Sequence, residues 1–205
     1  MKNAETPAYK VILFGADSSL GSALMVESLT RQHEVTAVVD DLNRQAPRPG
    51  LHFKLGALGS ADQAEQAAAG GTAVIALLSQ LAPDDMAAQA RLSEALVAGL
   101  TRTTIRRLLL VGDFNALDQP GRYTEAQRAC VDQIVDGLQR SALQWTLINA
   151  PEDCPGLGME HFRSLQGTLE PEIAAPLRRL AGVAAGMVDM LELHLHRGEH
   201  LNFVV

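Results

Sequence analysis

The stretch KVILFGADSSLG, residues 10–21, decides the fold of this chain of 205 residues. The segment from Lys10 to Phe14 is almost wholly apolar and predicts a buried β-strand. A glycine turn follows directly, and residues 19–32 carry apolar side chains at helical spacing, which predicts a helix. A strand, a glycine turn and a helix in this order form the first half of a βαβ unit, the building block of a parallel sheet.

Short apolar runs continue to alternate with helix-like stretches along the rest of the chain. Further strands are predicted at 34–39, 51–55, 73–78, 107–111, 145–148 and 202–205, and further helices at 62–69, 84–100, 124–140 and 181–196. Unbroken apolar strands are typical of a sheet with helices on both faces. We therefore predict an α/β fold, a Rossmann-type doubly wound parallel sheet, in a single domain that spans residues 1–205.

Composition excludes several classes of protein. Hydrophobic residues make up 47% of the chain and charged residues 20%, which is typical of a globular protein. The net charge of -7 disfavours nucleic acid as a partner, because the only local basic cluster is Arg102, Arg106 and Arg107. No apolar run approaches the roughly 18 residues that cross a bilayer, and residues 1–10 lack a secretory signal, so no membrane partner and a cytoplasmic location are expected.

The glycine turn predicts a phosphate site, because backbone N–H groups at a helix N-terminus can hold a pyrophosphate. Gly15 permits the tight turn and Gly21 permits close packing of the helix on the strand. Ser18 stands where such loops carry a glycine, and its side chain either crowds the phosphate or donates a hydroxyl to it. Asp17 must point away from a bound pyrophosphate, since like charges about 4 Å apart repel by about 4 kcal/mol.

The second predicted strand ends in Asp40, the position from which a carboxylate accepts hydrogen bonds from an adenosine ribose. This acid favours NAD(H) over NADP(H), because it would repel a 2'-phosphate. Its alternative role is that of a helix cap or a solvated acid. The candidate cofactor-binding residues are Gly15, Asp17, Ser18, Ser19, Leu20, Gly21, Asp40 and Ser79.

The run KVILFGADSSLGSAL (10–24), followed by HEVTAVV (33–39), resembles the start of the atypical short-chain dehydrogenase/reductases. Within them it is most similar to the NAD(P)H-binding NmrA-like and NADH-flavin reductase-like proteins. The similarity continues in RLLLVG (107–112), in LQWTLI (143–148) and in residues 183–205, so it spans most of the chain. The resemblance implies a dinucleotide bound across the carboxyl ends of the strands, flavin as one candidate substrate, and a homodimer as a family-level expectation.

The chain departs from the family pattern at several positions. Asp17 and Ser18 replace residues of the glycine motif, Ala57 stands where relatives place an aspartate near the adenine, and residues 149–151 replace an Arg-Pro pair. Tyr123 is followed four positions later by Gln127, so the Tyr/Lys pair that passes a proton in larger relatives is absent.

Substrate-pocket candidates follow the later strands. These are Asp113, Phe114, Asn115 and Asn149. Their alternative roles are turn formation for Asp113 and Asn115 and core packing for Phe114. Of the histidines, His194, His196 and His200 are not expected to bind a metal, because the first two point to different faces of a helix.

Two functions from different classes fit these residues. The first is an NAD(P)H-dependent oxidoreductase that reduces a flavin, a quinone or a small carbonyl compound, by hydride transfer that needs no acid from the protein. The second is a catalytically degenerate dinucleotide sensor or protein-interaction scaffold, which the altered glycine motif and the missing Tyr/Lys pair favour.

Overall fold

The computed structural model describes residues 8–42, 48–164 and 171–203. Within them, seven strands form one sheet in the order β3-β2-β1-β4-β5-β6-β7, and all neighbours are parallel. The strands are β1 (Lys10–Phe14), β2 (Glu34–Val39), β3 (Leu51–Leu55), β4 (Ala73–Leu77), β5 (Arg107–Val111), β6 (Gln144–Asn149) and β7 (Glu199–Asn202). The order reverses between β1 and β4, which is the topological switch point of a doubly wound sheet. The predicted Rossmann-type fold is confirmed.

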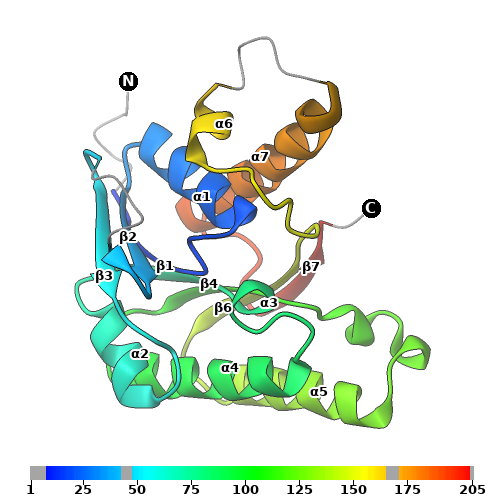
Figure 1. The fold of residues 1–205 in the computed structure, drawn as a ribbon. Helices are drawn as coiled ribbons and strands as arrows, with labels where there is room; N and C mark the ends of the chain where they lie inside the picture. Colours follow the sequence, from blue (N-terminus) through cyan, green and yellow to red (C-terminus); the bar gives the residue numbers. More distant parts are fainter. Residues whose placement is uncertain (1–7, 43–47, 165–170, 204–205) are drawn as a thin grey trace.

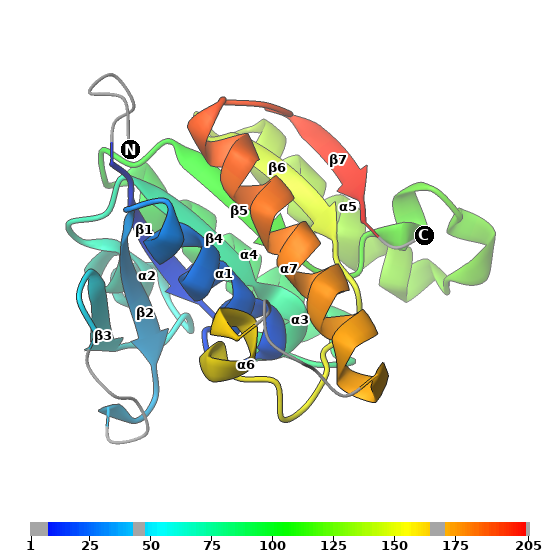
Figure 2. The ribbon, with the colours of Figure 1, turned by 90° about the horizontal axis from the view of Figure 1, so that it is seen from above.

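Helices cover both faces of the sheet, as Figure 1 shows. They are α1 (Ser19–Thr30), α2 (Ala61–Ala68), α3 (Leu78–Leu81), α4 (Met86–Thr101), α5 (Glu125–Gln139), α6 (Met159–Arg163) and α7 (Pro171–Glu192), with 3-10 turns at Asn115–Leu117 and Pro120–Arg122. Helices α1, α6 and α7 lie on one face, and α2, α4 and α5 on the other. Seen from above in Figure 2, α1 and α7 run side by side across the sheet.

The central strand β4 shows why this sequence requires two helical layers. All five of its residues, AVIAL, are buried. Ile75 packs into the core beneath α1 and α7, while Val74 and Ala76 pack into the core beneath α4. A strand with apolar side chains on both faces is stable only when each face is covered.

Two predicted elements near the C-terminus were placed wrongly. The last strand was predicted at 202–205 and lies at Glu199–Asn202; residues 204 and 205 fall outside the described part of the chain. Helix α7 was predicted at 181–196, but it begins at Pro171 and ends at Glu192. It continues through Pro176, although a proline normally interrupts a helix.

Helix α7 ends early because the chain turns at His194. This residue has a left-handed backbone with φ of 54°, and the Leu195 N–H donates to the Met190 carbonyl at 3.2 Å. The bond and the left-handed residue form a Schellman-type helix end, with histidine in the place where glycine is most common. Neither the turn nor its left-handed histidine is visible in the apolar periodicity of the sequence.

Arg107 ties this helix end to the sheet. Its guanidinium donates to the carbonyls of Met190 and Leu195 at 3.3 and 2.8 Å and to the Thr146 hydroxyl at 2.8 Å. Only 3% of the residue is exposed, and burial, with Arg197 nearby, lowers the pKa of Arg107 to about 10. Arg107 is therefore a buried structural cation rather than part of a surface basic patch.

Ion pairs hold the same end of α7 to α1. Arg31, at the end of α1, pairs with Asp189 and with Glu192, the latter at 2.9 Å. The buried His33 places Nε2 3.0 Å from a carboxylate oxygen of Glu192. Thus the C-terminal end of α7 is fixed by directional polar contacts.

The start of α1 lies against the turn that follows β1. Gly15 has φ of 84°, and a Cβ on Gly21 would lie 2.5 Å from the Gly15 carbonyl oxygen and 2.7 Å from that of Ala16. Only glycine permits this approach of helix to turn.

Among the described residues, no helix has the length and apolar character needed to cross a bilayer.

We expect Gly21→Ala to lower the free energy of unfolding by about 1–3 kcal/mol or more, because the added methyl overlaps two backbone carbonyls. Urea unfolding followed by circular dichroism measures this loss. Gly137→Ala in α5 is the control: no atom lies within 4 Å of its new Cβ, so helix propensity should raise stability by up to about 1 kcal/mol. Equal stabilities of Gly21→Ala and the wild type would contradict the close contact.

Candidate functional site

A cavity of about 390 Å³ lies at the carboxyl ends of the strands, where β1 and β2 meet the turn before α1. Its walls come from that turn, the end of β2, the segment after β3, α3 and the loop after β6. The lining residues are Phe14, Gly15, Ala16, Asp17, Ser18, Val38, Val39, Asp40, Gly56, Ala57, Leu58, Gln80, Leu81 and Asp153. The cavity is thus adjacent to the switch point, where ligands bind in open α/β sheets.

Ser18 forms hydrogen bonds within the glycine turn. Its hydroxyl donates to the Gly15 carbonyl at 2.8 Å and accepts from the Gly21 N–H at 3.0 Å. Ser18 is therefore the N-cap of α1, and its single hydroxyl proton is used inside the turn. The side chain stabilises the turn that a glycine would leave without a cap.

A carboxylate occupies the N-terminus of α1. Asp153, in the loop after β6, accepts a hydrogen bond from the Ser19 N–H at 2.8 Å and a second one from the Ser19 hydroxyl. The first-turn N–H groups of a helix attract anions, since they carry the positive end of the helix dipole. Asp153 thus takes the position expected for a phosphate oxygen.

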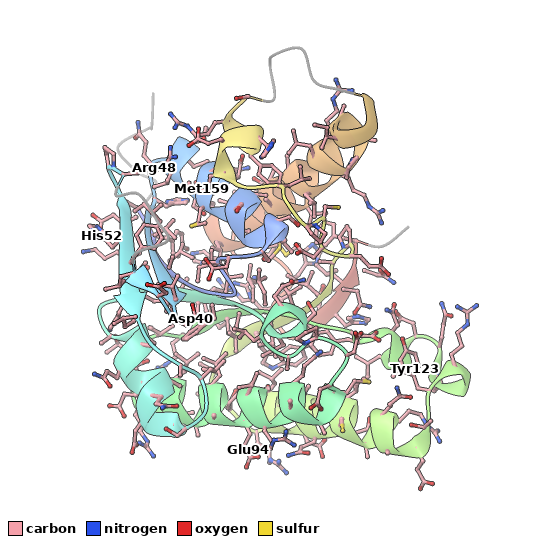
Figure 3. All side chains as sticks on the ribbon, viewed as in Figure 1. Asp40, Arg48, His52, Glu94, Tyr123 and Met159 are labelled. Atoms are coloured by element: carbon pink, nitrogen blue, oxygen red, sulfur yellow. The ribbon has the colours of Figure 1, made fainter. Side chains whose placement is uncertain are left out.

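The other predicted cofactor residues lie around the same cavity. Asp40 is exposed at the end of β2, and Figure 3 shows it beside that strand, far from Tyr123. Asp17 is exposed in the turn, whereas Leu20 is 3% exposed and packs in the core. Ser79 lies in α3, next to the lining residues Gln80 and Leu81.

The charge of the cavity wall is wholly acidic among the residues that line it. Asp17, Asp40 and Asp153 contribute carboxylates, and none of the lining residues is a lysine or arginine. Such a wall suits a ribose diol, which donates hydrogen bonds, and opposes additional phosphates. The glycine turn and Asp40 fit the adenosine half of a dinucleotide, but the pyrophosphate position is held by Asp153.

The substrate-pocket candidates meet in a hydrogen-bonded network at the ends of β5 and β6. The Asn149 amide donates to Asn115 at 3.1 Å and accepts from the Phe114 N–H at 2.7 Å. Asn115 in turn donates to Asp113 at 2.9 Å. The Phe114 ring is fully buried and packs edge-on against His200, so it offers no face to a ligand.

Tyr123 belongs to this network as well. Its hydroxyl donates to Asp113 at 3.0 Å, and burial together with that bond raises the pKa of the Tyr123 phenol. Gln127 accepts hydrogen bonds from the N–H and hydroxyl of Thr124, capping α5. A phenol with a raised pKa and no lysine beside it is a poor proton donor.

The three histidines near the C-terminus each contact a different residue. His194 lies 3.4 Å from the Tyr9 hydroxyl, His196 pairs with Glu199 at 2.7 Å, and His200 lies 3.0 Å from the Asn149 amide nitrogen. No group of three or more metal-ligating side chains gathers anywhere in the described ranges.

A second cavity, of about 570 Å³, adjoins the first through Asp153. Its wall is largely apolar, from Pro151, Ala175, Pro176 and Leu180. The charged residues that line it are one cation, Arg179, and two acids, Glu152 and Asp153. The sequence predicts Asn149 as a pocket residue near this region, but neither Asp153 nor Arg179. A carboxylate shortly after a strand's carboxyl end is a weak signal for Asp153; Arg179 lies just before the predicted helix start and gave no signal.

Comparisons with known proteins identify the family and the fold. The family model described as NAD(P)H-binding matches residues 15–152, which include the glycine turn, Asp40 and the ends of β4 to β6. A search of curated proteins gives no match.

Solved structures share the fold at low sequence identity. A "putative epimerase" from Bacteroides thetaiotaomicron has a TM-score of 0.67 at 21% identity, with 96% of each chain covered. A "putative NADH-flavin reductase" from Streptococcus pneumoniae has a TM-score of 0.62 at 22% identity, covering 95% of this chain and 98% of its own. A wide-type short-chain dehydrogenase/reductase from Veillonella parvula, solved with NADP, has a TM-score of 0.63 at 16% identity and covers 95% and 93%.

The capping role of Ser18 predicts that Ser18→Ala lowers the free energy of unfolding by about 1 kcal/mol, because the Gly21 N–H loses its acceptor. Ser18→Gly should lower the free energy of unfolding by only about a few tenths of a kcal/mol. Chemical denaturation of both variants tests the difference. A Ser18→Ala variant as stable as the wild type would show that the cap contributes nothing.

Proposed function

The chain belongs to the NAD(P)H-binding family, and on that premise we propose that it is an NADH-dependent oxidoreductase that reduces a flavin, a quinone or a small carbonyl compound. The observation that carries the proposal is the cavity formed by the glycine turn and Asp40 at the carboxyl ends of the strands. A reduced dinucleotide whose adenosine half binds there would supply a hydride from its nicotinamide, and the protein would supply position.

Asp40 supports NADH rather than NADPH as the cofactor. Its carboxylate stands at the end of β2 among cavity residues that carry no cation. A ribose 2'-hydroxyl donates to such a carboxylate, whereas a 2'-phosphate meets a like charge.

The second cavity supports an acceptor that takes a hydride directly. It is largely apolar, it adjoins the dinucleotide cavity, and no Tyr/Lys pair stands at the expected spacing. Planar acceptors such as flavins and quinones need no proton donor positioned by the protein for hydride transfer itself. A small carbonyl compound would take its proton from solvent.

One observation favours a second function, a dinucleotide-fold sensor or scaffold without catalysis. Asp153 occupies the N-terminus of α1, and Ala57, at the cavity wall, stands where the family resemblance implies an aspartate. A chain that no longer binds a pyrophosphate would keep the fold and lose the chemistry.

Two measurements together test the proposed function. Calorimetric titration with NADH and with NADPH should give measurable affinity with NADH the tighter ligand, and NADH oxidation should accelerate when FMN or a soluble quinone is added. Binding without oxidation by any acceptor would favour the sensor. No binding of either cofactor at millimolar concentration would rule out the reductase.

The role of Asp40 is tested by substitution. Asp40→Ala should weaken NADH binding about tenfold and bring the affinities for NADH and NADPH closer together, because the charged ribose acceptor is lost. Asp41→Ala, which removes the adjacent acid outside the cavity wall, should leave both affinities unchanged. If Asp40→Ala keeps the wild-type preference, Asp40 does not contact the ribose.

A further inference from the structure

We propose that Asp153 is an internal competitor of the cofactor: its carboxylate binds the N-terminus of α1 in place of the pyrophosphate and must leave before a dinucleotide can bind. This inference rests on the proposed dinucleotide site and concerns its regulation. It predicts a protein with two states, one in which α1 is capped by its own chain and one in which α1 is available to the ligand.

The contacts show that the carboxylate is held firmly. Asp153 accepts from both the N–H and the hydroxyl of Ser19, and the same hydroxyl accepts from the Cys154 N–H at 3.0 Å. Ser19 is only 3% exposed. Three hydrogen bonds therefore hold the loop after β6 against the helix. Hydrogen bonds to a charged acceptor are stronger than those between neutral groups.

The competition is for the Ser19 N–H at the helix start. The N–H of Gly21 is taken by Ser18 in a bond that does not involve Asp153, whereas that of Ser19 is taken by Asp153. A pyrophosphate that accepts from the Ser19 N–H cannot share it with a carboxylate, because two anions in contact repel. The adenosine end of the cavity, at Asp40 and Val39, lies outside this competition.

Arg179 provides a place for the released carboxylate. Asp153 and Arg179 line the same second cavity, and among the described residues no hydrogen bond or ion pair to Arg179 is observed. Asp153 lines both cavities, so its movement away from Ser19 enlarges the first and changes the wall of the second. Binding of the dinucleotide would thus alter the acceptor cavity through one side chain.

The decisive experiment compares three ligands on two variants. Asp153→Ala should raise the affinity for NADH and for ADP by about tenfold or more, because the competing state is removed, while the affinity for adenosine stays the same. Glu152→Gln is the matched control, since it removes a neighbouring charge of the same loop that makes no contact with Ser19. It should leave the ADP affinity within about twofold of the wild type.

The results for ADP and adenosine distinguish a failure of this inference from a failure of the proposed function. Unchanged or weaker ADP binding by a folded Asp153→Ala variant overturns the competition, even if the wild type binds NADH. Stronger ADP binding by Asp153→Ala supports the competition, even if no acceptor is ever reduced. An equal gain for adenosine would also overturn it, because adenosine carries no pyrophosphate. Ser19→Ala, which keeps the N–H but removes one bond to Asp153, should give a smaller gain in ADP affinity.

The destination of the carboxylate is tested by a double-mutant comparison. Arg179→Ala should weaken ADP binding in the wild type, because the released state loses its ion pair, and should have no effect in the Asp153→Ala background. Arg178→Ala, at the exposed neighbouring position outside the cavity, is the control. Equal weakening in both backgrounds would mean that Arg179 acts on the ligand rather than on Asp153.

Discussion

The close contact between the start of α1 and the turn after β1 is the constraint on which the site depends. Gly21 permits α1 to approach the carbonyls of Gly15 and Ala16, and Ser18 caps the helix from within that turn. The contact fixes where the first N–H groups point. Any anion at the start of α1, whether a phosphate or the Asp153 carboxylate, is placed by that direction.

The sheet was predictable because each of its strands is marked by a short run of sequence, independently of distant residues. The bounds predicted for β1, β2, β3 and β5 match the structure, since each is a short extended run set off by turn residues or helices. The largest errors fall at the bounds of α7 and β7, where Pro176 lies inside the helix and His194 adopts a left-handed backbone after it. The end of α7 depends on a long-range contact, because Arg107 donates to it from a strand about 80 residues away in sequence.

Only those residues of the site that lie in consecutive elements of the chain were predictable from the sequence. Gly15, Ser18, Gly21 and Asp40 follow consecutive elements, so their spacing in sequence carries the geometry. Asp153 lies 134 residues from Ser19, and its role arises only when the loop after β6 folds back over α1. Likewise the pairing of Asn149 with Asn115 and the complete burial of Phe114 depend on how three strand ends meet.

The two ends of α7 are held by different kinds of force. Arg31, His33 and Arg107 bind its C-terminal end through directional contacts, whereas its earlier residues Leu177 and Leu180 are held by apolar packing, which has no preferred direction. Because a helix of 22 residues is about 33 Å long, a rotation of about 5° about its C-terminal end would move the far end by about 3 Å. The second cavity is lined by the earlier residues of α7, so such a rotation would change its width.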